Sequence, residues 1–271
     1  MANVLRSAAY VLQRFVLQRP YLTAHADVFG LRFRVKTEDV VGRHIYKYGQ
    51  HEPAMTRWLS EHIEFADGDV VIDIGANIGW YSLLCAQMAG DHDVSVVGFE
   101  PDPVNYSLFE QNVALNAVTT VRCEALALAD ENGTATLHQH SDSNRGRHSL
   151  LPINAVGSTE IATMRLDDYW REQGFGERVP RLIKIDIEGF ELMALRGAPH
   201  LLERCPLLIL EFSPAYMRRG DLDPQQLIAL LNARGGHIER LDPDGSLVPA
   251  DLDALAGQNR QCDLICRKDV G

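Results

Sequence analysis

The sequence lacks several features that mark specialised classes of protein. No apolar run approaches the ~20 residues that a membrane-spanning helix needs, and the N-terminus shows no apolar segment with a cleavage site typical of secretory signals. The five cysteines include no C-x-x-C pair and lie mostly within apolar runs, which is typical of reduced core residues. We therefore expect a cytoplasmic, globular protein.

Basic residues are also scarce, since 26 Lys and Arg stand against 37 Asp and Glu for a net charge of −11. Because binding to nucleic acid depends on clustered basic side chains, this balance predicts that nucleic acid is not a partner. Residues 1–26 are the exception, because they contain no acid but include Arg6, Arg14 and Arg19.

Apolar residues recur at helical spacing in this acid-free segment and predict a basic amphipathic helix. We expect its apolar face to pack on the domain or on a second subunit, as in a homodimer. Contact of residues 1–19 with the inner face of a membrane is the alternative.

From residue 67 onward, short apolar segments alternate with helical stretches. This order predicts a Rossmann-like α/β fold with a mostly parallel sheet of seven strands. Residues 262–267 are expected to form an antiparallel last strand, and residues 125–140 an inserted β-hairpin. The expected organisation is an N-terminal extension over residues 1–66, with an amphipathic helix, short strands and helices, followed by one domain over residues 67–271.

A glycine-containing loop follows the first strand of the expected sheet. It reads Asp73-Ile74-Gly75-Ala76-Asn77-Ile78-Gly79. Glycine allows the sharp turn at the strand end and a close approach of the helix that follows. A dinucleotide fingerprint would carry G-x-G-x-x-G, but Asn77 occupies the place of its second glycine. The loop therefore disfavours a pyrophosphate ligand.

Acidic residues end the strands of the expected sheet. Glu100 ends the second strand, where a carboxylate can accept both hydroxyls of a ribose. A ribose acceptor without a pyrophosphate loop points to S-adenosylmethionine. Asp186, Glu188 and Glu211 follow later strands, and crowding raises the pKa of at least one carboxyl, as suits a general base near neutral pH.

Several further side chains are candidates for the same site. Asp186 or Glu188 is the preferred base, and His51-Glu52-Pro53 is a candidate for the acceptor pocket, as is His148 in the loop of residues 141–158. Lys184 is expected to form an ion pair with Asp186. The three acids also leave open a divalent cation, which we do not favour because no clear metal-ligand spacing is present.

Four segments resemble the FkbM-type methyltransferases in order and spacing. They are D-I-G-A-N-I-G-W-Y-S (73–82), F-E-P-D-P-V-N-Y-S-L-F-E-Q-N-V-A-L-N (99–116), A-L-A-D-E-N-G-T-A-T-L (127–137) and K-I-D-I-E-G-F-E (184–191). The resemblance implies the class I methyltransferase fold, S-adenosylmethionine as cofactor, and methylation of a hydroxyl on a sugar, glycolipid or secondary metabolite. By position it also implies a role for each of several residues: Asp73, Gly75, Asn77 and Gly79 at the methionine end, Glu100 at the ribose, and Glu124 or Ala125 beside the adenine.

The sequence therefore predicts an S-adenosylmethionine-dependent O-methyltransferase. Two alternatives remain open: an NAD(P)-dependent Rossmann oxidoreductase, and a non-catalytic protein that binds S-adenosylmethionine.

Overall fold

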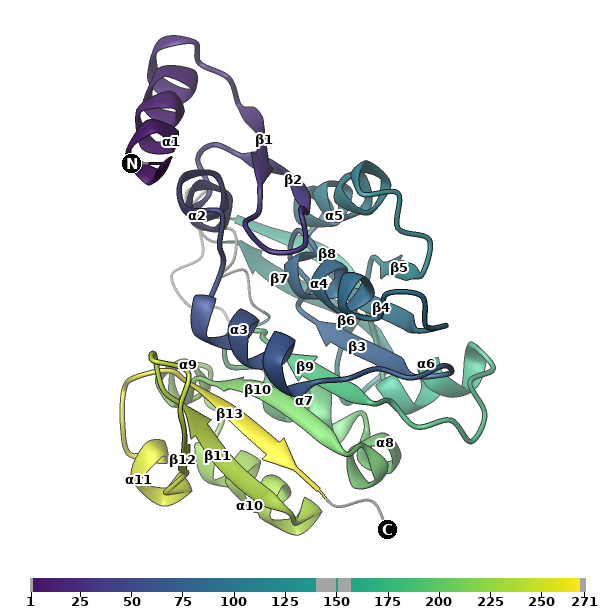
Figure 1. The fold of residues 1–271 in the computed structure, drawn as a ribbon. Coiled ribbons are helices and arrows are strands. Elements are labelled where there is room, and N and C mark those ends of the chain that lie inside the picture. The colour runs from purple at the N-terminus through teal and green to yellow at the C-terminus, as the bar shows by residue number, and fades with distance from the viewer. Residues whose placement is uncertain (1, 140–149, 151–156, 269–271) are drawn as a thin grey trace.

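The computed structural model describes residues 2–139, 150 and 157–268. Across these ranges the largest element is an eight-stranded sheet with the strand order β12-β11-β13-β10-β9-β3-β4-β5 (Figure 1). Its parallel part consists of β3 (Val70–Ile74), β4 (Ser95–Phe99), β5 (Val121–Glu124), β9 (Leu182–Ile185) and β10 (Leu207–Phe212). The other strands are β11 (His237–Leu241), β12 (Leu247–Pro249) and β13 (Cys262–Arg267).

The Rossmann-like α/β class, the mostly parallel sheet and the antiparallel last strand are confirmed, because β13 runs antiparallel to both β10 and β11. The predicted number of seven strands is wrong, because β12 adds an eighth at the edge. β12 spans three residues and pairs with β11 across a tight turn, in which the Gly245 N–H donates to the Asp242 carbonyl. A strand this short shows no alternation of apolar and polar residues.

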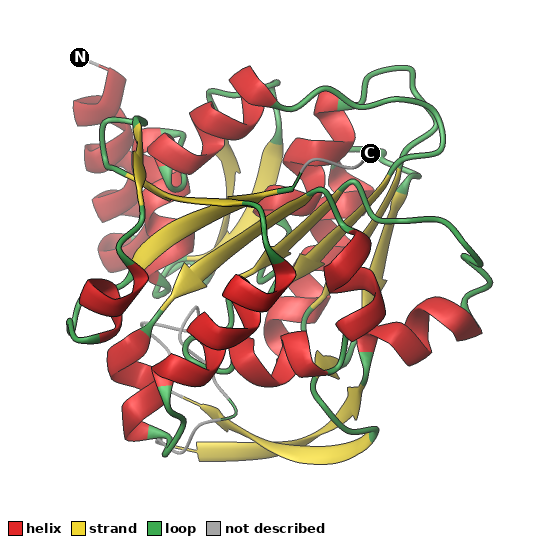
Figure 2. Cartoon of the chain, turned by 90° about the horizontal axis from the view of Figure 1, so that it is seen from below, coloured by secondary structure: helices red, strands yellow, loops and turns green. Residues whose placement is uncertain are grey.

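Helices cover both faces of the sheet (Figure 2). One face carries α4 (Trp80–Met88), α3 (Pro53–His62) and α2 (Val40–Tyr48), and this hydrophobic core includes Leu83, Trp58 and Ile45. The opposite core includes Tyr169, Leu195 and Leu227. The helices that carry those residues and their neighbours are α6 (Leu166–Glu172), α7 (Glu191–Arg196), α8 (Pro199–Arg204), α9 (Pro214–Arg219), α10 (Pro224–Arg234) and α11 (Leu252–Ala256). Burial on both faces explains why β3 is apolar at every position except Asp73.

The centre of the sheet is the place where its strand order reverses. β3 is parallel to β4 on one side and to β9 on the other. Ligands of open α/β sheets bind beyond the carboxyl ends of the strands at such a point. Gly75 follows β3 with φ +81°, and a Cβ at this position would lie 2.0 Å from the Asp186 carbonyl oxygen. Only glycine therefore allows the ends of β3 and β9 to lie this close.

The insertion between β5 and β9 forms a separate sheet with the order β6-β8-β7. Its strands are β6 (Ala127–Leu128), β7 (Gly133–Gln139) and β8 (Gly157–Met164). The predicted hairpin over residues 125–140 is wrong in its pairing, because β8 lies between β6 and β7. β7 pairs with β8 along its whole length and buries Leu137 against Ile161. A two-residue strand such as β6 could not form as many hydrogen bonds with β7 or bury as much apolar surface.

Residues before β3 form α1 (Ala2–Val11), a π-helical turn η1 (Leu12–Val16), β1 (Tyr21–His25), β2 (Arg32–Lys36), α2 and α3. β1 and β2 form an antiparallel hairpin. Phe33 of β2 stacks on Trp80 with ring centroids 5.1 Å apart, so this segment shares a core with α4. The division of the chain at residue 66 stays a prediction.

The apolar face of the N-terminal helix does not pack on the domain, because Val4 and Phe15 are 71% and 62% exposed. That half of the expectation is wrong, and packing of the same face on a second subunit stays a prediction. Among the described residues, no helix combines the length and the hydropathy needed to cross a membrane.

The remaining helix, α5 (Pro103–Leu115), follows β4. Asp102 caps its N-terminus, because the Asp102 side chain accepts from the Val104 and Asn105 N–H groups.

Candidate active site

Two pockets meet at the carboxyl ends of β3, β4, β9 and β10. The first, which we call the apolar pocket, has a volume of about 570 Å³. Its walls include Phe99, Leu126, Leu128, Leu137 and Phe190, and the Glu100 carboxyl lies among them. Apolar walls with a few placed polar groups are typical of small-molecule sites.

Glu100 is the carboxyl group of the apolar pocket. It is 6% exposed, and each carboxyl oxygen accepts one backbone N–H, from Asp102 at 2.8 Å and from Asn77 at 2.9 Å. Burial raises the pKa of Glu100 to about 8, although the two N–H groups favour the charged form. The remaining lone pairs of both oxygens can accept the two hydroxyls of a ribose.

Peptide N–H groups of the loop between β3 and α4 form hydrogen bonds within the protein. The Gly75 and Ala76 N–H groups donate to the Phe99 carbonyl, the Asn77 N–H donates to Glu100, and the Gly79 N–H donates to the Ala76 carbonyl. A pyrophosphate site needs free N–H groups that point at the ligand. Because these four are already engaged, the loop is poorly suited to a dinucleotide.

The second pocket, which we call the acidic pocket, spans about 990 Å³ including its open mouth, and Val40 and Val41 of α2 form part of its wall. It is lined by Asp186, Glu188 and Glu211, together with His51 and Glu52 from the N-terminal segment. The two pockets share Gly75, Asn77 and Asp186. A ligand in either pocket would therefore lie next to the other pocket at Asp186.

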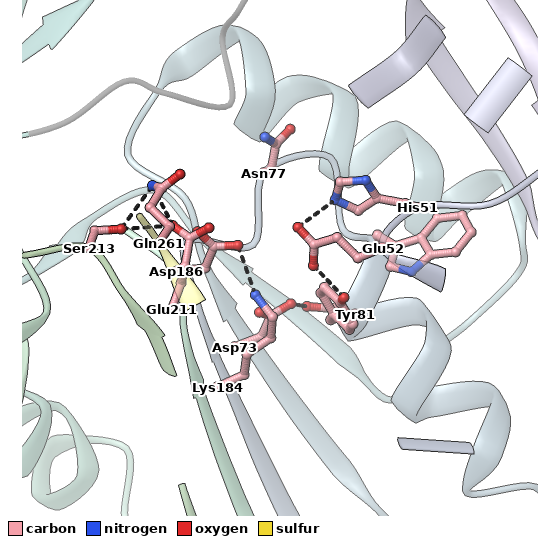
Figure 3. Close-up of polar contacts among 12 residues, drawn as sticks. His51, Glu52, Asp73, Asn77, Tyr81, Lys184, Asp186, Glu211, Ser213 and Gln261 are labelled. Atoms are coloured by element: carbon pink, nitrogen blue, oxygen red, sulfur yellow. Dashed lines mark hydrogen bonds and ion pairs between the residues drawn. The ribbon is translucent and has the colours of Figure 1, made fainter. Parts of the chain in front are cut away.

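Lys184 lies beneath the acidic pocket and is 5% exposed. Its Nζ is 3.2 Å from Asp186 Oδ2, so the predicted ion pair is present, and 4.3 Å from the centre of the Tyr81 ring (Figure 3). Burial lowers the pKa of Lys184, but the carboxyl groups of Asp186, Asp73 and Glu52 outweigh this effect and hold the pKa above its ordinary value. A charged Lys184 thus fixes Asp186 in place.

Glu188 and Glu211 share a hydrogen-bond donor that comes from the far end of the chain. Gln261 Nε2 lies 2.8 Å from Glu188 Oε2, 3.1 Å from Glu211 Oε2 and 2.8 Å from Ser213 Oγ (Figure 3). Burial, and then the charges of Asp186, Glu188 and other acids, raise the pKa of Glu211 well above its ordinary value. The pocket thus contains a carboxyl group suited to hold a proton near neutral pH.

A second group of contacts closes the opposite wall. The Tyr81 hydroxyl donates to Glu52 Oε2, and His51 Nε2 lies 3.6 Å from Glu52 Oε1. Burial raises the pKa of Glu52, but His51, Lys184 and the Tyr81 hydroxyl together hold it below its ordinary value. The acidic pocket therefore holds charges of both signs.

Backbone strain gathers at the acidic pocket. Three of the non-glycine residues that line it adopt a left-handed conformation, namely Glu52 with φ +42°, Asn77 with φ +53° and Glu188 with φ +52°. Each such residue costs about 1 kcal/mol or more. Strained conformations that persist in one place are typical of functional sites.

Other predicted site residues lie outside the walls of both pockets. Asp73 is 1% exposed and accepts from the Ser82 hydroxyl at 2.6 Å, beneath the pockets. Gly79 approaches Phe109, since an added Cβ would lie 2.2 Å from that ring. Glu124 accepts from the Tyr169 hydroxyl at 2.7 Å, and Ala125 is exposed. Leu126, Ala127 and Leu128, the residues just after them, line the apolar pocket.

Two other predictions from the sequence concern the loop of residues 141–158 and a metal ion. His148 lies outside the described residues. Within the described part of the chain, no group of three or more His, Cys, Asp or Glu side chains is arranged to hold a metal ion.

Sequence patterns gave no indication of several residues that complete the site. Gln261 lies in a polar turn, and Tyr81 and Trp80 lie in an apolar helix whose pattern indicates only burial. Glu52, by contrast, belongs to the predicted His51-Glu52-Pro53 segment, and it lines the acidic pocket at the start of α3.

β13 lies antiparallel beside β10, and two pockets lie at the carboxyl edge of the sheet. Together this fold and this site define a Rossmann-like methyltransferase. More particularly, the chain belongs to the FkbM methyltransferase family, because the sequence profile of the methyltransferase FkbM domain matches residues 73–238.

Two curated relatives are similar over much of the chain. The hexuronic acid methyltransferase AglP of Haloferax volcanii is 26% identical over 214 residues, which cover 79% of this chain and 81% of the relative. The 31-O-demethyl-FK506 methyltransferase FkbM of Streptomyces tacrolimicus is 29% identical over 170 residues, 52% of this chain and 63% of the relative. A solved structure, the methyltransferase FkbM of Methylobacillus flagellatus KT, is 22% identical with a TM-score of 0.46 and covers 76% of this chain and 45% of its own.

Proposed function

We propose that the chain is an S-adenosylmethionine-dependent O-methyltransferase that acts on a hydroxyl of a sugar, glycolipid or secondary-metabolite acceptor. The observation that carries the proposal is the junction of the two pockets at Gly75, Asn77 and Asp186. One pocket suits a nucleoside and the other suits a polyhydroxylated molecule, because its carboxylates can accept several hydroxyl hydrogen bonds.

The residues of the apolar pocket fit the adenosine part of the cofactor. Glu100 accepts the ribose hydroxyls, since its oxygens are held in place by two backbone N–H groups. Leu126, Leu128 and Phe190 provide apolar surface for a purine. The Asn77 side chain lies at the junction of the two pockets, where it can contact the methionine end of the cofactor. When bound, S-adenosylmethionine supplies a methyl group on a sulfonium.

In the acidic pocket, Asp186 is our proposed general base, because it is the acid that lines both pockets. Its carboxylate accepts the proton that the acceptor hydroxyl loses. The methyl group would come from the sulfonium of bound S-adenosylmethionine, whose C–S bond breaks to leave S-adenosylhomocysteine. Glu188, Glu211 and His51 hold the acceptor through its other hydroxyls. Alignment of the reacting atoms contributes much of the rate in such a displacement.

The names of two relatives support a hydroxyl acceptor. One is named for a hexuronic acid and the other for 31-O-demethyl-FK506, so a sugar acid and an oxygen-bound methyl group both occur among similar proteins. Neither name identifies the acceptor of this chain. A polyol without net charge suits the acidic pocket better than an anion, since acids outnumber His51 and Lys184 among its lining residues.

Calorimetry with S-adenosylhomocysteine and with NAD⁺ tests the cofactor. We expect the first to bind and the second not to bind, because the N–H groups of the loop are engaged. Binding of NAD⁺ alone would support the oxidoreductase instead. Methyl transfer to a panel of sugars and other polyols then tests the reaction, and binding without turnover on any of them would favour the non-catalytic alternative.

A further inference from the structure

The N-terminal helical segment presents its apolar face to solvent. Val4, Phe15 and Val16 are 71%, 62% and 66% exposed. The exposed apolar positions of α1 and η1 follow helical spacing and form one stripe, which we call the outer stripe: Val4, Leu5, Ala8, Val11, Leu12, Phe15 and Val16. A surface helix normally turns such a stripe toward the core, and a contiguous exposed apolar face marks an interaction site.

Polar contacts on the inner side fix this orientation. The buried Tyr10 hydroxyl donates to the Thr37 carbonyl, and Arg14 donates to the same hydroxyl at 3.0 Å. Arg6 forms a 2.8 Å ion pair with Asp27. These contacts hold the helix on the protein by its polar side, so the outer stripe is displayed by the fold itself.

The charge around the outer stripe has the opposite sign to the rest of the chain. Residues 1–26 contain arginines and no acid, whereas the whole chain has a net charge of −11. Arg6 is paired with Asp27. The Arg14 guanidinium, by contrast, lies 4.9 Å from the centre of the Phe15 ring, and Arg19 is exposed just after the stripe. An apolar stripe bordered by such arginines is complementary to an anionic lipid surface, where apolar side chains enter the acyl region and guanidinium groups remain among the phosphates. We infer that α1 and η1 dock the protein on an anionic membrane surface through the outer stripe.

The docking helix is connected to the acidic pocket. Figure 1 shows α1 beside α2, and Tyr10 lies 5.8 Å from the Tyr46 ring of α2. Val40 and Val41, at the other end of α2, line the acidic pocket. If the proposed function holds, which docking itself does not require, this arrangement suits an acceptor sugar carried on a lipid.

Vesicle flotation of the full chain tests the inference. We expect flotation with vesicles of phosphatidylcholine and phosphatidylglycerol, and about tenfold weaker binding to phosphatidylcholine alone, because the arginines then lose their anionic partners. The double variant Leu12→Asp/Phe15→Asp should weaken binding to the anionic vesicles roughly a hundredfold, since two apolar side chains are lost from the contact.

A matched control adds the same two charges elsewhere. Ala229 and Ala233 are exposed on α10, far from α1 (Figure 1), so Ala229→Asp/Ala233→Asp should float like the wild type. Affinity for S-adenosylhomocysteine, measured on every variant, reports an intact fold and is independent of docking. The inference is overturned if the wild type binds neither vesicle, or if it is a dimer that the double variant turns into a monomer with no lipid binding in either form.

Discussion

The apolar and acidic pockets hold their carboxyl groups by different means. In the apolar pocket, backbone N–H groups of Asn77 and Asp102 hold Glu100. In the acidic pocket, side chains hold the acids, as Lys184 holds Asp186 and Gln261 holds Glu211. Backbone donors remain in place when a side chain is substituted, whereas side-chain donors can be removed one at a time: Lys184 lies two residues from Asp186, and Gln261 lies 50 residues from Glu211. With the proposed roles, a substitution in the first pocket should alter cofactor affinity, and one in the second should alter turnover.

The largest effect is expected for Asp186→Asn. The amide cannot take a proton from the acceptor, so kcat should fall by about 10²- to 10⁴-fold. Affinity for S-adenosylhomocysteine should stay within about threefold of the wild type, because no charged contact to the ribose is lost. Single-turnover rates and calorimetry measure the two effects, and Glu131→Gln, at an exposed turn, serves as control. An unchanged rate would place the base at another residue.

Next in size is Glu100→Ala. Removal of the carboxylate should weaken binding of S-adenosylhomocysteine roughly 100-fold, because hydrogen bonds to a charged group are lost and buried ribose hydroxyls remain unpaired. Saturating cofactor should restore most of kcat. Calorimetry measures the affinity, and Glu131→Ala is the matched control. Equal affinity in both variants would remove Glu100 from the ribose site.

Affinity for S-adenosylhomocysteine should also depend on pH. The pKa of Glu100 is about 8 in the free protein because of burial, and the ribose hydroxyls favour its charged form. Affinity should therefore rise as pH increases through this pKa, roughly tenfold between pH 7 and 8.5. Glu100→Ala should remove the dependence. If the variant keeps the same slope, another group is responsible.

A smaller effect is expected for Gln261→Leu. Glu188 and Glu211 lose a shared donor, and its loss raises the pKa of Glu211 further. We expect kcat to fall about fivefold and its pH profile to move toward alkaline pH, with cofactor affinity retained. A loss of rate that is the same at every pH would show that Gln261 only supports the fold.

Much of the sheet and of the apolar pocket follows from the sequence because it depends on local patterns. Buried parallel strands are continuous apolar runs, and an acid at the end of such a run lies at the carboxyl edge. The positions of Glu100, Asp186 and Glu211 could be predicted in this way. The short edge strand β12 has no such pattern, and the residues of β7 pair with residues of β8 that lie 18 to 30 positions further along the chain.

The acidic pocket and the N-terminal helix were less predictable for a different reason. Periodicity indicates which face of a helix is apolar, but not whether that face meets the protein or solvent. The contact of Gln261 with Glu188 joins residues 73 positions apart, and no pattern near either residue encodes it. Such contacts depend on how loops place whole elements.

The three residues common to both pockets have a thermodynamic consequence. Gly75, Asn77 and Asp186 form part of each wall, so a ligand in one pocket becomes part of the surface that the other ligand meets. The two binding free energies are then not independent. By reciprocity, whatever factor the cofactor product imposes on affinity for the acceptor, the acceptor imposes on affinity for the cofactor product.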